Sequence, residues 1–347
     1  MLRKKMPLYA VAAAWAAGTT CVLLVMGHGE APRKIAIHHP ESTGTHCPYI
    51  LKRVQVSAHV RPLLSAEPQC ESSRYAEVKE AVVHAIERAK VEGLAEAVSV
   101  YVRDFNKGEW FTVDGDRRYD PGSLTKLPVA LTLLRMTESD PALRTRAMGL
   151  KGTLNMPEHR HAPSEPLDPS GAYDLAELLE RSLEHSDKTA SAILAQQMDY
   201  KLFRSLLRQL GLPDLAGDLD SYPLSSAGYA QFIEALYTSP FLSPRTSQYL
   251  MDLLLRSEFK DGMRAGIPEE VEVAHDFGEA SGDGAFQLHD AGLVFAPNGT
   301  YLAVVMTQGR AFDALPGVVA RVHETIYQGM GATSAHHGRA RNPQPAA

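Results

Sequence analysis

Apolar residues recur along this chain at spacings that predict a sequence of helices and strands. Near the start of the folded part, four of them recur at helical spacing: Val78, Val82, Ile86 and Ala89. Gly93 follows this run, so we expect an amphipathic helix that ends there. Alternating apolar positions over 98–102 and a second apolar run over 110–113 flank a polar turn at 106–108. This arrangement predicts a β-hairpin.

The middle of the chain is helical in pattern, and strand patterns return near its end. Six helical segments are separated by loops with Pro and Gly: 127–136, 173–183, 189–198, 202–210, 229–237 and 246–255. Three strand patterns follow, and then a last amphipathic helix: 271–277, 286–295, 301–307 and 313–327. We therefore predict an α+β fold in which one antiparallel sheet is built from both ends of the domain, with flanking helices and an inserted all-helical lobe.

The first 27 residues predict a membrane anchor. Basic residues at 3–5 precede an uncharged run from Met6 to Gly27 that is long enough to cross a bilayer. The small residues at 18–20 are followed by more apolar sequence, which favours an uncleaved anchor over a cleaved signal peptide. Because the basic flank stays in the cytoplasm, we expect the protein at the cell membrane with its folded domain outside.

Composition and patterning together divide the chain into four parts. Residues 1–27 are the cytoplasmic stub and anchor, 28–73 a tether rich in Pro, His and Ser with one β-like stretch at 51–60, 74–330 the folded domain, and 331–347 a disordered tail. Cys47 and Cys70 would meet an oxidising compartment, where they could pair or remain two free thiols.

The formal net charge of −6 gives no basic field, so nucleic acid is not an expected partner. The histidine pairs His38 with His39 and His159 with His161 come without a ligand set, so we expect no metal and no other cofactor.

Two Ser-x-x-Lys patterns offer a nucleophile with a lysine one helical turn away. Ser257 to Lys260 runs into Asp261 and Gly262, where nothing would hold the pair in a pocket. Ser123 to Lys126 follows Pro121-Gly122 and opens an apolar helix, which places both side chains on one face near the positive end of the helix dipole. A lysine in such a site can act as base toward the serine, although a plain N-cap serine beside a solvated lysine is the alternative.

The segment 119–128, Tyr-Asp-Pro-Gly-Ser-Leu-Thr-Lys-Leu-Pro, resembles the nucleophile segment of class A β-lactamases and penicillin-binding serine hydrolases. Downstream, 185–190 resembles the Ser-Asp-Asn loop of that family, and 273–279 with 289–292 resembles its Lys-Thr-Gly strand and the strand after it. The order and spacing of these motifs agree over about 74–329. The resemblance implies the serine β-lactamase/transpeptidase-like fold.

Carried over residue by residue, the resemblance implies roles for this chain. Ser123 would be the acylated nucleophile, Lys126 its base, and Ser186 the hydroxyl that passes a proton to the leaving group. Backbone N–H groups of Ser123 and Glu279 would form the oxyanion hole. Asp187 would hold the loop backbone.

Three departures from the family change the picture. Lys188 stands where the family has Asn, and Asp276 and Phe277 stand where it has Lys and Thr or Ser, before Gly278. We predict that Lys188 and Asp276 pair across the cleft and line it with Phe277 and Gly278. Between 210 and 226 no Glu-x-x-Leu-Asn segment appears, and Asp218 and Asp220 are the nearby carboxylates. Rapid β-lactam hydrolysis is therefore not expected.

A Ser-His-Asp triad of Ser123 with His289 and Asp290 is not expected, because neighbouring strand residues face opposite sides of a sheet. The sequence favours an exported serine acyl-hydrolase or acyltransferase of the cell envelope that acts on an amide or ester, such as a β-lactam or a peptidoglycan peptide. The alternative is a catalytically impaired protein of this fold that serves as a binding or scaffold module.

Overall fold

A computed structural model describes the residues 47–55, 59–153, 160–161, 163, 165–215, 217, 219, 222–282 and 284–339. The predicted anchor over 1–27 lies outside them, as do Asp218 and Asp220. Among the described residues, no helix combines the length and the apolar character needed to cross a membrane.

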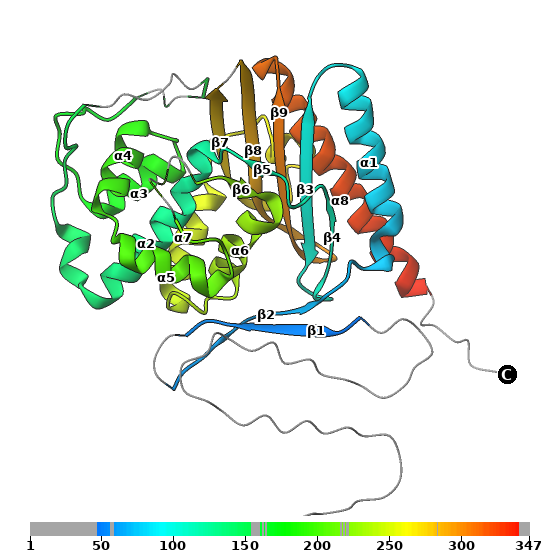
Figure 1. Ribbon diagram of the computed structural model, residues 1–347, viewed down its shortest axis with the longest axis horizontal. Coiled ribbons are helices and arrows are strands. Elements are labelled where there is room, and N and C mark those ends of the chain that lie inside the picture. Colours follow the sequence, from blue (N-terminus) through cyan, green and yellow to red (C-terminus); the bar gives the residue numbers. More distant parts are fainter. Residues whose placement is uncertain are drawn as a thin grey trace, which may run out of the picture.

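A five-stranded antiparallel sheet in the order β4-β3-β9-β8-β7 forms the centre of the fold (Figure 1). Its strands are β3 (Ala97–Asp104), β4 (Glu109–Val113), β7 (Glu272–Gly282), β8 (Ala285–Ala296) and β9 (Gly299–Gly309). Two come from the start of the domain and three from its end. The predicted α+β architecture, with one sheet built from both ends, is confirmed.

Helices cover both faces of the sheet (Figure 1). One face carries α1 (Ala76–Val91) and α8 (Leu315–Arg339). The other packs against the helical lobe, which contains α2 (Lys126–Ser139), α3 (Leu175–Leu183), α4 (Lys188–Gln197), α5 (Tyr200–Leu210), α6 (Ser226–Tyr237) and α7 (Pro244–Leu255). All six helical segments expected in the middle of the chain are present.

Strand alternation divides the buried apolar side chains into two cores. In β9, Leu302, Val304 and Met306 point to the lobe, whereas the intervening residues belong to the core beneath α1 and α8. Successive side chains of a strand point to opposite faces, so a strand buried on both sides is apolar throughout. The sheet is therefore the middle layer of three, and its edge strand β7 borders the lobe.

A second strand was missed in the segment before the domain. The single β-like stretch expected at 51–60 is a hairpin of β1 (Tyr49–Arg53) and β2 (Leu63–Pro68). A disulfide between Cys47 and Cys70, one of the two states left open by the sequence, closes this hairpin at its base. The hairpin is also tied to the core, because the buried Arg103 of β3 pairs with Glu67 of β2 at 3.0 Å and with Glu234 of α6 at 2.8 Å.

The C-terminal helix is longer than expected. The sequence suggested a helix over 313–327 and a disordered tail from 331, but α8 continues to Arg339.

Short two-residue strands, β5 (Arg118–Tyr119) and β6 (Leu224–Ser225), pair with each other beside the turn that leads to Ser123.

Candidate active site

The candidate nucleophile lies on the short 3-10 helix η2 (Gly122–Thr125), which leads directly into α2. The backbone N–H of Lys126 donates to the carbonyl oxygen of Ser123, so the two residues are one turn apart. Ser123 is half-buried, whereas Lys126 is only 5% exposed. This local geometry places the buried lysine one turn after a partly exposed serine, as the Ser-x-x-Lys spacing predicted.

The ammonium group of Lys126 lies among three side chains, two from β7 and one from the loop before α4. Its Nζ is 2.9 Å from Oδ1 of Asp276 and donates to the hydroxyl of Ser186 at 3.2 Å. It also lies 4.7 Å from the centre of the Phe277 ring. The structure therefore brings Lys126 and Ser186, two of the residues that the resemblance assigned to catalysis, into direct contact.

The predicted partner of Asp276 was wrong. Asp276 pairs with Lys126, and the expected ion pair with Lys188 does not form. Asp276 lies on the face of β7 that borders α2, and the other oxygen of its carboxylate accepts from Tyr229 of α6 at 3.4 Å. Lys188 is the first residue of α4 and is half-buried. The spacing along the sequence could not decide which of two lysines on the lobe would meet the strand.

The Lys126–Asp276 pair is buried on both sides, with side-chain exposures of 2% and 1%. Burial raises the pKa of Asp276, and the nearby charge of Lys126 opposes this effect without cancelling it. The short contact is not aligned as a hydrogen bond at Oδ1. Because burial raises the pKa of the Asp276 carboxyl, it lowers the free-energy cost of moving a proton to this carboxyl from the adjacent ammonium group.

Ser186 is held in an unusual backbone conformation. Its φ is +57°, in the left-handed region that residues with a side chain seldom adopt. Asp187 fixes the loop around it, because its carboxylate accepts from the backbone N–H groups of Ala190 at 2.9 Å and Leu167 at 2.7 Å. The structural role expected for Asp187 is confirmed, and the result is a fixed hydroxyl beside Lys126.

Two glycines let β7 approach the nucleophile turn closely. A Cβ added at Gly278 would lie 2.5 Å from the backbone nitrogen of Leu124, and one at Gly122 would lie 2.0 Å from the carbonyl oxygen of Glu279. Only glycine fits such contacts. The backbones of Ser123 and Glu279, the residues expected to form the oxyanion hole, are thereby brought together.

Aromatic rings stand next to the lysine, and of these the sequence analysis predicted Phe277 alone. Phe277 stacks on Phe259 with ring centres 4.0 Å apart, and His161 meets both rings edge-on. The side chain of Glu279 accepts from the backbone N–H groups of Arg160 at 2.8 Å and His161 at 3.1 Å, and it also contacts Nδ1 of His161. More than 100 residues separate the partners, and no local spacing rule connects them.

His161 has a second carboxylate partner in Asp261, at 3.4 Å from Nε2. Burial lowers the pKa of His161, but its hydrogen bonds to Glu279 and Asp261 and their charges raise it above the ordinary value. The histidine that had no evident partners in the sequence thus links the end of β7 to the loop after α7.

The second Ser-x-x-Lys pair does not form a comparable arrangement. Lys260 is exposed and donates to the backbone oxygen of Ser257, and the Ser257 hydroxyl is buried without a hydrogen-bond partner. His289 and Asp290 lie on opposite faces of the sheet, as expected. Nε2 of His289 donates to the carbonyl of Asp120 at 2.9 Å, and burial lowers the pKa of His289 to about 4, so it is neutral behind the nucleophile turn.

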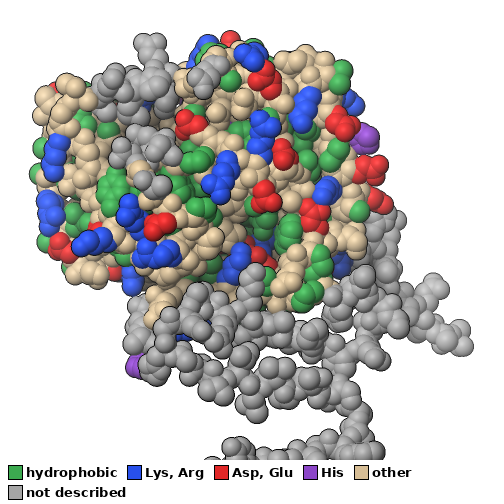
Figure 2. All heavy atoms as spheres, in the orientation of Figure 1, with side chains coloured by type: hydrophobic (Ala, Val, Ile, Leu, Met, Phe, Trp, Pro, Cys, Tyr) green, Lys and Arg blue, Asp and Glu red, His purple; other side chains and the backbone are tan. Residues whose placement is uncertain are grey.

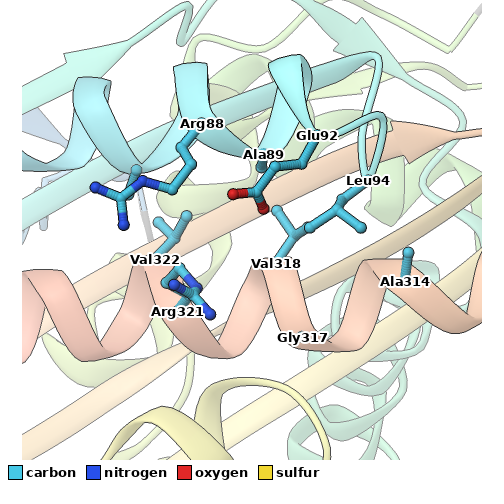
Figure 3. A pocket seen from close by; sticks show the side chains of 10 residues that line it. Arg88, Ala89, Glu92, Leu94, Ala314, Gly317, Val318, Arg321 and Val322 are labelled. Carbon is cyan, nitrogen blue, oxygen red and sulfur yellow. The ribbon is translucent and has the colours of Figure 1, made fainter.

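One pocket lies away from these residues, between α1 and α8 on the other side of the sheet (Figure 3). Its labelled side chains include Arg88 from α1, Glu92 directly after that helix and Arg321 from α8. It contains none of the predicted site residues. Within the described part of the chain, no three His, Cys, Asp or Glu side chains are grouped to hold a metal ion.

Comparison with known proteins agrees with this fold. The family model described as the beta-lactamase enzyme family matches residues 81–330. A PBP-A mutant, solved as an acyl-enzyme complex with penicillin G, superposes with a TM-score of 0.62 at 19% identity, covering 73% of this chain and 97% of its own. A class A beta-lactamase from Mycobacterium abscessus gives 0.61 at 20% identity, with coverages of 72% and 99%.

A beta-lactamase from Xanthomonas campestris pv. campestris is similar to the same extent, with a TM-score of 0.62 at 18% identity and coverages of 73% and 99%. No curated protein sequence matches the chain. Identities this low show a shared fold.

Proposed function

The chain belongs to the beta-lactamase enzyme family of serine hydrolases, and from this premise we propose that it is an exported acyl-hydrolase or acyltransferase that forms an acyl-enzyme on Ser123. The substrate is an amide or ester of the cell envelope, such as a β-lactam or a peptidoglycan peptide. The observation that supports this proposal most directly concerns the buried amine of Lys126. This amine contacts the hydroxyl of Ser186, and Lys126 itself lies one helical turn after Ser123.

The first step moves two protons and forms one bond. A proton of Lys126 transfers to Asp276, which leaves a neutral amine next to the nucleophile turn. Oγ of Ser123 then bonds to the carbonyl carbon of the substrate while its proton moves to Lys126. The negative charge that develops on the carbonyl oxygen is stabilised by the backbone N–H groups of Ser123 and Glu279.

The second step breaks the bond to the leaving group. The proton gained by Lys126 passes through the hydroxyl of Ser186 to the leaving nitrogen or oxygen. The acyl group remains on Ser123. Because the chain lacks the Glu-x-x-Leu-Asn segment, the acyl-enzyme should persist, with loss over minutes or longer as an order of magnitude.

A fluorophosphonate probe tests the proposal, because it reacts with an activated serine without needing a particular substrate. We expect labelling that is abolished by Ser123→Ala and by Lys126→Ala. Ser257→Ala is the matched control, since it removes the serine of the second Ser-x-x-Lys pair, and it should retain the label. A folded wild-type protein that does not react would support the binding or scaffold alternative.

Export is a separate part of the proposal, supported by the basic residues before the apolar run at 6–27. Fusions of reporter enzymes to the C-terminus test it. We expect activity from a reporter enzyme that works only outside the cytoplasm. Activity from a reporter enzyme that works only in the cytoplasm would refute the envelope location.

A further inference from the structure

The side chain of Glu279 places a negative charge beside the proposed oxyanion hole. Glu279 supplies one of the two backbone N–H groups of that hole, and the residue is only 4% exposed. Covalent geometry keeps a glutamate carboxylate within about 6 Å of the N–H of the same residue. A buried negative charge at that distance opposes the negative charge that develops on the substrate oxygen, unless a cation neutralises it.

The ring of His161 lies where such a cation is needed. Its Nδ1 contacts Oε1 of Glu279, and its Nε2 lies 3.4 Å from Oδ2 of Asp261. A neutral imidazole has one N–H donor and one lone pair, whereas the charged ring donates from both nitrogens. Because a carboxylate oxygen faces each nitrogen, only the charged ring can donate to both partners.

Other charged groups on the neighbouring segments do not neutralise Glu279. Three cations are engaged by other partners: Lys126 pairs with Asp276 at 2.9 Å, Arg160 pairs with Asp313 at 3.0 Å, and Lys260 donates to the backbone oxygen of Ser257 at 2.7 Å. The second carboxylate at the ring, Asp261, has a side chain that is 67% exposed, so water screens its charge. The charge of His161 therefore acts mainly on Glu279.

From these contacts we infer that His161 is a positioning residue for acylation: its charged ring holds the Glu279 side chain and neutralises the carboxylate beside the oxyanion hole. When the ring releases its proton to water, the carboxylate loses both a hydrogen bond and its counter-charge. The inference rests on the proposed function, because it assumes that Ser123 is the nucleophile and that the backbone of Glu279 binds the oxyanion.

The rate of acylation should therefore fall as the pH rises through the folded-state pKa of His161. Burial lowers this pKa, but the hydrogen bonds and charges of Glu279 and Asp261 raise it above the ordinary value. Loss of a proton from the Lys126–Asp276 pair supplies the base, so it does not produce a fall in rate. A rate that decreases with pH thus reports His161.

Rates of fluorophosphonate labelling of Ser123, measured on the full chain from about pH 5 to about pH 10, test the inference. The phosphoryl oxygen of the probe takes the place of the carbonyl oxygen, and each rate is corrected for hydrolysis of the probe without protein. We expect the wild-type rate to fall about tenfold toward high pH. NMR of the His161 ring in the same protein should give a titration midpoint that coincides with the midpoint of this fall.

Substitutions at both partners test the origin of the fall. His161→Gln removes the titratable charge, so it should react slowly at every pH and show no fall. Glu279→Gln removes the carboxylate, so its rate should not fall either, and adding His161→Gln to it should cost less than His161→Gln alone. His84→Gln, at an exposed position on α1, is the matched control and should keep the fall. Thermal melts identify the variants that are folded.

The outcomes separate the inference from the function on which it rests. A wild-type rate that does not fall, or a fall that persists in His161→Gln, would overturn the inference, while labelling of Ser123 would uphold the proposed function. A fall whose midpoint differs from the titration of the His161 ring would also overturn it, and this comparison needs no variant. Absence of labelling at Ser123 at every pH would overturn the proposed function and the inference together.

Discussion

The most unusual residue of the site is Asp276, a buried carboxylate that pairs with the proposed catalytic base. Attraction between buried charges is offset by the cost of removing both from water, so the pair itself adds little to stability. Leaving one of the two charges without its partner is costly. Asp276 therefore holds the Lys126 ammonium in place, even if the ion pair adds no net stability to the fold.

Removing only Asp276 should destabilise the protein strongly. Asp276→Leu leaves the Lys126 ammonium buried without a counter-charge, and we expect a loss of about 3–5 kcal/mol in the free energy of unfolding. The double variant with Lys126→Met replaces the pair by apolar side chains and should recover most of that loss. Denaturant unfolding measures both.

The exposed pair of Arg310 and Glu96, with side-chain exposures of 71% and 41%, is the control. Glu96→Gln should cost less than about 1 kcal/mol. If the double variant at the buried pair is as unstable as the sum of its two single variants, the two side chains do not interact as described.

His161 should make stability depend on pH. Its folded-state pKa is raised, so its contribution is fully present below the unfolded value of about 6.5 and is lost as the pH rises through the folded-state pKa. We expect wild-type protein to exceed His161→Gln in stability by more at pH 6 than at pH 9. His84→Gln, at an exposed position on α1, is the matched control for replacing a histidine by glutamine.

A stability difference between wild type and His161→Gln that grows toward pH 9 would mean that the bonds to Glu279 and Asp261 do not favour the charged ring.

Among the elements, the contact between β7 and the turn η2 determines the geometry of the site. Gly278 lies at this contact, where an added Cβ would meet the backbone of Leu124 and Pro121 at 2.5 and 2.6 Å. Backbone atoms cannot move out of the way by changing a rotamer, as a flexible side chain can. The strand and the turn must separate if the glycine is replaced.

Gly278→Ala should therefore slow acylation of Ser123 by about 100-fold, because a shift near 1 Å misplaces the oxyanion donors. Gly282→Ala, in the same strand, meets nothing within 4 Å and should react at the wild-type rate. Rates of fluorophosphonate labelling measure both. Equal rates for the two variants would show that β7 does not set the geometry at Ser123.

The β1–β2 hairpin depends on its disulfide. Cys47 and Cys70 are 23 positions apart, and closing a loop of that length restricts the unfolded chain. Cys47→Ser with Cys70→Ser should lower the free energy of unfolding by about 3 kcal/mol relative to the oxidised wild type. If unfolding of wild-type protein is the same with and without reductant, the bridge does not contribute to stability.

At the scale of the whole molecule, periodicity predicted the fold well. The helix over α1, the β3–β4 hairpin and the helices of the lobe rest on local spacing, and all are present. β2 was missed because Leu63–Pro68 has Pro at its end and little alternation. Acidic and basic side chains are intermingled over the face shown in Figure 2, in keeping with the small net charge.

The site could be predicted only in part. Ser123, Lys126 and Ser186 could be proposed as site residues because short motifs carry them, and the structure brings Lys126 against Ser186. The partner of Asp276 was not, because strand alternation gives the face of a residue but not its neighbour on another helix. The bond between His161 and Glu279 joins a loop to a strand across 118 positions, and no local pattern in the sequence indicates it.

The central claim is that Ser123 forms a covalent acyl-enzyme with Lys126 as its base. The most direct measurement is the mass of the intact protein after reaction with an activated aryl ester, followed by fragmentation of the modified peptide. The account predicts one added acyl group, located on Ser123, that is absent in Ser123→Ala and in Lys126→Ala. An acyl group on Ser257, or one that still forms in Ser123→Ala, would contradict it.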